Sequence, residues 1–61
     1  MALKELIKVA DYDTLVYITN QNGKQLYNGI ITGIPKNLME LEIWCIIPTD
    51  FYSLEIKLRT H

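Results

Sequence analysis

The sequence is poor in the residues that build disulfides, metal sites and catalytic centres. Its 61 residues include one cysteine, Cys45, and one histidine, His61. One cysteine excludes an internal disulfide, and one cysteine with one histidine cannot form the usual four-ligand zinc site. Gly29 and Gly33 fall within a predicted strand and lack the lysine and helix of a phosphate-binding loop. We therefore expect no metal and no cofactor.

An excess of charge of either sign and a long apolar run are also missing. Seven acidic residues face six basic ones, the net charge is −1 and the pI is about 5.6. A grip on a phosphate backbone needs clustered Lys and Arg, so this balance argues against nucleic-acid binding. The apolar runs are far shorter than the ~20 residues of a membrane span. Lys4, Glu5 and Lys8 interrupt the segment where a secretory signal would be continuous. The sequence predicts a cytoplasmic protein without a membrane segment.

Apolar side chains are abundant, at 49% of the residues. The length predicts a single domain over residues 1–61. A domain of this size buries only about 60% of the surface that its unfolded chain exposes, so its core is marginal. Small cores are commonly supplemented by disulfides, metals or oligomerisation. With the first two excluded, the composition predicts a homo-oligomer.

The first ten residues predict a short amphipathic helix, because Leu3, Leu6 and Ile7 follow helical spacing. Such a helix is too short to be stable alone. It either plugs the open end of a small barrel or contacts a partner. The turn at residues 11–13, with two aspartates around a tyrosine, has too few ligands for a Ca²⁺ or Mg²⁺ site.

Residues 14–59 predict a sheet. A β-branched strand over 14–19 is followed by Asn22-Gly23, the strongest short-range signal for a hairpin. The next strand extends from Gln25 to about Ile34, and its internal glycines predict the bend that curls a small sheet into a barrel. Residues 35–39 predict one helical turn.

The last hairpin carries the most informative pattern. Strands over 41–47 and 51–59 are predicted on either side of residues 48–50. Their apolar faces match when Ile47 lies opposite Tyr52, and this register also sets Glu42 opposite Lys57, a favourable pair. The same alternation directs Cys45 into the core.

This register places Trp44 beside Glu55 and Ile46 beside Ser53 on the outer face. A large aromatic side chain on an outer face indicates that another element, a second copy or a partner covers it. We therefore predict an interface made of Trp44, Ile46, Glu42 and Glu55. The alternative is that Trp44 packs under the N-terminal helix or against the bent second strand.

The order of elements and the stretch TLVYITNQNGKQLYNGIITGIPKNLMELEI resemble the Sm-like family, with an apolar strand, a turn ending in Gly23, a second glycine at 29 and another apolar strand. The resemblance implies a mainly β fold: a small Sm/SH3-like barrel of four to five antiparallel strands with a short N-terminal helix. Pro35 stands where RNA-binding members carry Asp, and Met39 or Glu40 where they carry Asn. The family's uridine pocket does not carry over.

In size, the chain is also similar to small proteins encoded by phages and mobile elements, which often bind a host component. The leading hypothesis is thus a noncatalytic, homo-oligomeric binding module, in one version a phage-encoded inhibitor of a host protein. One alternative sequesters a small anionic ligand, such as a signalling nucleotide, between subunits. Another is a weak RNA-binding Sm-like protein. Enzymatic activity is not expected, because Cys45 is predicted to be buried and His61 is terminal.

Overall fold

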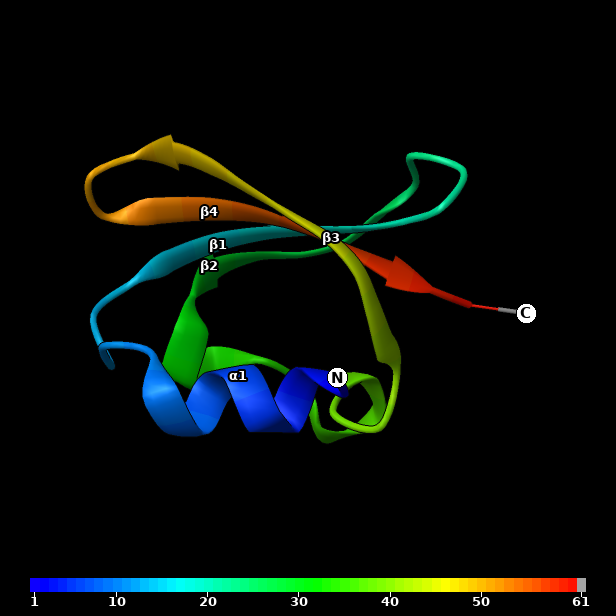
Figure 1. Ribbon diagram of the computed structural model, residues 1–61, viewed down its shortest axis with the longest axis horizontal. Coiled ribbons are helices and arrows are strands. Elements are labelled where there is room, and N and C mark those ends of the chain that lie inside the picture. Colours follow the sequence, from blue (N-terminus) through cyan, green and yellow to red (C-terminus); the bar gives the residue numbers. More distant parts are fainter. Residues whose placement is uncertain (61) are drawn as a thin grey trace.

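The structure is a computed structural model that describes residues 1–60; His61, the terminal histidine named above, lies outside the described residues. One helix, α1 (Leu3–Val9), packs against a four-stranded sheet (Figure 1). The strands are β1 (Leu15–Asn20), β2 (Gln25–Ile30), β3 (Glu42–Asp50) and β4 (Ser53–Arg59). Two 3₁₀ turns, η1 (Ile31–Gly33) and η2 (Lys36–Leu38), connect β2 to β3. The expected mainly β fold with a short N-terminal helix is confirmed.

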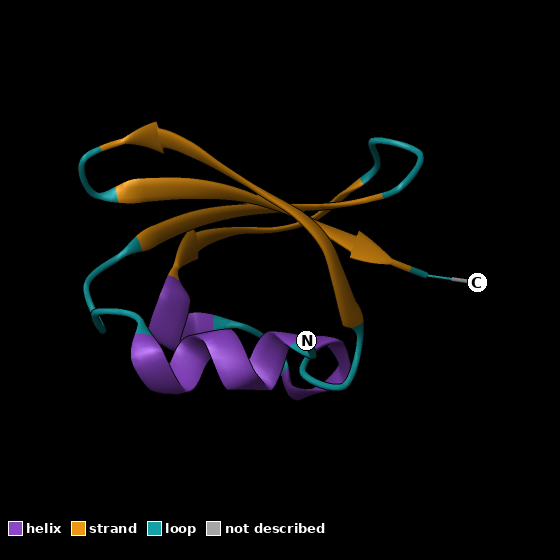
Figure 2. Cartoon of the chain, viewed as in Figure 1, coloured by secondary structure: helices purple, strands orange, loops and turns teal. Residues whose placement is uncertain are grey.

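The sheet is open and mixed, so the expectation of a closed antiparallel barrel was wrong. Its strand order is β2-β1-β4-β3. The two hairpins, β1–β2 and β3–β4, are antiparallel, whereas β1 and β4 run parallel at the centre. The helix and both 3₁₀ turns lie on one side of the sheet (Figure 2). The segment that connects the two hairpins therefore crosses one face from the β2 edge to the β3 edge.

The barrel does not close because β2 ends at Ile30, four residues before the end expected from the sequence. The Tyr27 hydroxyl donates a hydrogen bond to the Ile30 carbonyl at 2.8 Å. The same hydroxyl fills the space beside Gly33, where an added Cβ would lie 2.5 Å from it. The glycine thus allows the chain to leave the sheet beneath a tyrosine, and no bent strand remains to pair with β3.

The β1–β2 turn forms where the Asn-Gly signal predicts it, but Asn22 does not have the positive φ of the two-residue turn that this signal favours. Gly23 has a φ of +85°, a conformation that other residues adopt at a cost. The Asn20 side-chain oxygen accepts hydrogen bonds from the N–H groups of Asn22 (2.9 Å) and Lys24 (3.0 Å). The Gln21 side chain pairs with the Thr60 main chain, so this turn also holds the end of β4.

The core lies between the sheet and the crossing segment. Its fully buried side chains come from α1, β1, η1 and β4: Leu3, Val16, Ile18, Ile31, Ile56 and Leu58. Ile34 and Leu38 of the connection complete it, and Leu6 and Ile7 pack against it from α1. The helix therefore docks within its own chain, which is the first of the two roles expected for it, although it covers an open sheet rather than plugging a barrel.

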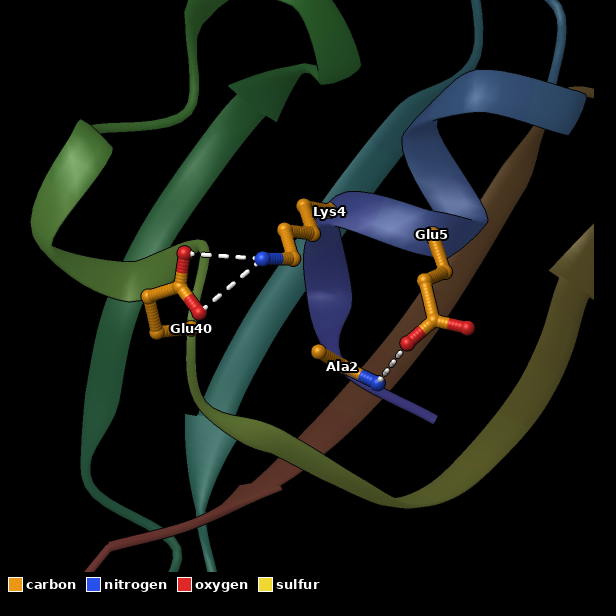
Figure 3. A network of polar contacts seen from close by, with 4 residues as sticks. All are labelled: Ala2, Lys4, Glu5 and Glu40. Carbon is orange, nitrogen blue, oxygen red and sulfur yellow. Dashed lines mark hydrogen bonds and ion pairs between the residues drawn. The ribbon is translucent and has the colours of Figure 1, made fainter.

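The start of α1 is tied to the connection and to β3. Lys4 forms an ion pair with Glu40 at 3.0 Å, and Glu5 accepts a hydrogen bond from the Ala2 N–H at 3.2 Å (Figure 3). Ala2 pairs with Glu42, and Ile43 donates its N–H to the Met1 carbonyl at 2.8 Å. The Met1 ammonium lies 3.0 Å from the Glu42 carboxylate, whose hydrogen bond and charge raise the pKa of that amine.

Candidate functional site

The β3–β4 hairpin differs from the one expected. Its turn is two residues, Phe51 and Tyr52, because Asp50 lies opposite Ser53. The expected pairing of Ile47 with Tyr52 was therefore wrong, and so was that of Glu42 with Lys57: Ile47 lies opposite Glu55 and Glu42 opposite Arg59. Pro48 is accommodated within β3, which extends three residues beyond its expected end.

Two irregularities explain the change of register. The pairing shifts between Ile43 and Cys45 and again between Pro48 and Asp50, so Trp44 and Thr49 have no direct partner in β4. An extra residue in one strand reverses which side chains face each side of the sheet beyond it. Simple alternation fails for this reason.

The first irregularity turns Cys45 outward. Cys45 lies opposite Lys57 and is exposed, so its predicted burial in the core was wrong. Ile46 instead lies opposite Ile56, a fully buried core residue, so Ile46 belongs to the inner face and not to the expected outer one. Its predicted neighbour Ser53 lies at the turn, opposite Asp50.

The structure separates the four residues of the predicted interface. Trp44 lies at the first irregularity and is 53% exposed. Ile46 lies on the inner face but outside the buried core, and is 38% exposed. Glu42 lies at the other end of β3, against Met1, and Glu55 lies opposite Ile47. Trp44 does not join the buried core, so neither the helix nor the second strand covers its side chain as the alternative prediction required. An interface through these residues stays a prediction.

The sequence reasoning missed the apolar residues nearest the turn. Phe51 is 96% exposed and Tyr52 is 73% exposed, and Ile47 is exposed to the same extent as Ile46. Phe51 and Tyr52 had been assigned to the start of a strand. The signal that could have found them is Asp50, whose side chain accepts a hydrogen bond from the Phe51 N–H at 2.7 Å, as aspartates often do in turns.

The free edge of β3 offers few main-chain groups to a pairing strand. Leu15 donates its N–H to Tyr52 across β1 and β4, so the main-chain groups of Ser53, Glu55 and Lys57 point the other way, toward β3. The main-chain groups of the β3 residues opposite them therefore already form hydrogen bonds with β4. In the regular ladder over residues 45–48, this leaves Ile46 and Pro48 pointing outward, and proline has no N–H.

The start of this edge is already covered, since residues 1–2 pair with residues 42–43. A proline, two irregularities and a covered end are the features by which natural sheets prevent edge-to-edge pairing. Assembly by extending the sheet at β3 is thus disfavoured. What β3 presents for binding is its side chains: Ile47 on the outer face, Ile46 on the inner face, and Trp44 at the first irregularity.

The described residues hold no cluster of three or more His, Cys, Asp or Glu side chains that could bind a metal ion. Within residues 1–60 the longest helix is α1, with 7 residues, and none is long and apolar enough to cross a membrane. A shallow open hollow beside the β3–β4 turn is lined by Pro48, Asp50 and Phe51. It adds an apolar recess next to the exposed turn.

The scan against protein-family models found no match, and neither did the searches of curated proteins and of solved structures. The Sm-like and phage resemblances therefore stay predictions made from the sequence.

Proposed function

We propose that this chain is a noncatalytic binding module that works as a homo-oligomer through the exposed side chains of the β3–β4 hairpin. The observation that supports the proposal is the amount of apolar surface on this one hairpin. Trp44, Phe51 and Tyr52 are 53, 96 and 73% exposed. At about 150–250 Å² per aromatic side chain, they expose roughly 300–550 Å² in total, divided between the turn and the irregularity at Trp44.

Side-chain packing is the mode of contact that the hairpin favours. The blunted edge disfavours strand addition, whereas Trp44 and Ile47 are available to a second copy. Aromatic side chains are enriched at the centres of protein interfaces, where a few of them contribute most of the binding energy. A second copy would also supply apolar contacts that a domain of 61 residues lacks.

The test is the mass in solution, measured by light scattering behind a sizing column over a concentration series. The expected result is a multiple of the 7.1 kDa chain. Ile47→Lys is the informative variant, because the new ammonium lies opposite Glu55 and forms a favourable cross-strand pair within the monomer. Burying that charge at a contact would weaken assembly at least tenfold.

Trp44→Ala is expected to act in the same direction, and Val9→Ala is the matched control. Val9 is also exposed, at 78%, but lies on α1, which covers the inner face of the sheet. Circular dichroism establishes that each variant is folded. A wild-type chain that stays monomeric at millimolar concentration would contradict the proposal, as would variants that assemble like the wild type.

A further inference from the structure

One end of the sheet gathers exposed apolar side chains from four segments. The register sets Leu15 opposite both Ile30 and Ser53, and the Leu15 N–H donates to the Tyr52 carbonyl at 2.8 Å. Phe51 adjoins Tyr52 in the turn, and the turn at residues 11–13 leads into β1 at the same end (Figure 1). We call this surface the apolar end; its members are Tyr12, Leu15, Ile30, Phe51 and Tyr52, which are 78, 51, 42, 96 and 73% exposed.

Acidic side chains surround the apolar end. Asp11 and Asp13 flank Tyr12, Asp50 precedes Phe51, and all three are exposed. The hydrogen bond from the Phe51 N–H holds one carboxylate oxygen of Asp50 beside the main chain of Phe51. The last turn of α1 contributes one opposing charge, Lys8.

Most of the basic side chains of the sheet lie toward the other end. Lys24 lies in the β1–β2 turn, Arg59 ends β4, and Lys57 lies opposite Thr19 in the second half of β1. The three aspartates thus lie at one end of the sheet and Lys57 and Arg59 toward the other, where Glu42 lies opposite Arg59 and is paired with the Met1 ammonium. The apolar end thus combines a hydrophobic centre with a negative rim.

We propose that the apolar end binds a cationic amphipathic segment of another protein. This inference rests on the proposed noncatalytic binding function and names the chemistry of the partner. Apolar residues of such a segment would cover Leu15, Phe51 and Tyr52, and its Lys or Arg side chains would lie near the three aspartates. Complementary charge at the rim of an interface provides specificity and speeds association.

The same charges disfavour the other occupants. An anionic lipid surface and a nucleic-acid backbone would be repelled by the three aspartates. A second copy packed through the same end would place like-charged carboxylates against each other, which is unfavourable. Self-assembly that uses only Trp44 and Ile47 of β3 leaves the apolar end free for this partner, whereas self-assembly that also uses Phe51 and Tyr52 competes with it.

The test uses two synthetic peptides of 14 residues with the same amphipathic pattern, one of Leu and Lys and the other of Leu and Glu. Each is titrated into the isotope-labelled protein at low salt, and amide resonances are followed by NMR. The Leu/Lys peptide is expected to shift the amides of residues 11–15 and 49–53. Three exposed ion pairs predict binding roughly 3- to 100-fold tighter than that of the Leu/Glu peptide, with the difference reduced at high salt.

Matched variants separate the apolar contribution from the charged one. Phe51→Ser is expected to weaken binding of the Leu/Lys peptide about tenfold or more, whereas Trp44→Ser, at an exposed aromatic away from the apolar end, is expected to leave that binding unchanged. Asp50→Asn retains the acceptor for the Phe51 N–H and should cost a few-fold in affinity. Glu40→Gln also removes one exposed carboxylate, beside Lys4 rather than at the apolar end, and should have no effect.

Equal binding of the two peptides, or binding of neither, would overturn the inference. So would tighter binding to vesicles of phosphatidylcholine with phosphatidylglycerol, or to oligouridylate, than to the Leu/Lys peptide. A monomer that distinguishes the two peptides would contradict the homo-oligomer of the proposed function and support this inference. An oligomer that binds both peptides alike would support the homo-oligomer of the proposed function and contradict this inference.

Discussion

The two hairpins are both antiparallel, but the turn of one is polar and the turn of the other is apolar. The β1–β2 turn is polar from Asn20 to Lys24, and its side chains are used internally: Asn20 closes the turn and Gln21 holds the Thr60 main chain. The β3–β4 turn presents Phe51 and Tyr52 to solvent. Only one of the two tips is explained by the stability of the fold. The other exposes aromatic surface that the monomer does not use, and this difference directs the search for function to the β3–β4 hairpin.

The largest expected effect compares two isoleucines that lie opposite each other. Ile56 is fully buried and Ile46 is 38% exposed. Ile56→Ala removes core contacts and leaves a cavity, so we expect a loss of about 2–5 kcal/mol in the free energy of unfolding. For Ile46→Ala we expect less than about 1 kcal/mol, because much of its apolar surface stays in water.

Urea unfolding followed by circular dichroism measures both changes. Equal losses would mean that Ile46 belongs to the core, and would remove it from the proposed contact surface. Such a result would also reduce the amount of exposed apolar surface on the β3–β4 hairpin that fold stability does not explain.

The second prediction compares the two turns directly. Gly23→Ala forces a side chain into a positive φ of 85° and should destabilise the fold by about 1–2 kcal/mol, although nothing within 4 Å would obstruct the new Cβ. Phe51→Ser should change the free energy of unfolding by no more than about 0.5 kcal/mol, because the ring is 96% exposed. The thermal midpoints of the two variants test this contrast. A large loss for Phe51→Ser would show that the apolar turn serves stability.

The smallest effect concerns the buried hydroxyl of Thr19, near the end of β1. Thr19 is 3% exposed, and among the described residues its side-chain oxygen is buried without a hydrogen-bond partner. Thr19→Val replaces the hydroxyl with a methyl group of similar size, so we expect a gain of about 1 kcal/mol. Ser53, whose hydroxyl is paired with Thr49, provides the control, since Ser53→Ala should not stabilise the protein. A loss of stability in Thr19→Val would indicate that a bound water satisfies the hydroxyl.

Local signals predicted the elements well. The spacing of Leu3, Leu6 and Ile7 located the helix, and Asn22-Gly23 located the first turn, because both depend on interactions within a few residues. The register of the last hairpin could not be predicted in the same way. Two extra residues, Trp44 and Thr49, interrupt the pairing, and simple alternation contains no information about them.

The candidate site was likewise predicted only in the part that does not depend on the strand register. Trp44 and Ile46 were identified as apolar side chains left over by the pattern, and both are exposed. The most exposed residue, Phe51, was missed because it was read as part of a strand rather than as a turn. Cys45 was placed on the wrong face for the same reason as Ile46: the irregularity at Trp44 precedes both.

The sequence by itself determined a small, mainly β chain with one short helix and an apolar surplus that its size cannot bury. The tertiary structure decided that the sheet stays open, because Tyr27 packs over Gly33 and ends the strand that would have closed it. It also decided which side chains share a surface. Tyr12, Leu15 and Phe51 are distant in sequence, and only the parallel pairing of β1 with β4 brings their segments to one end.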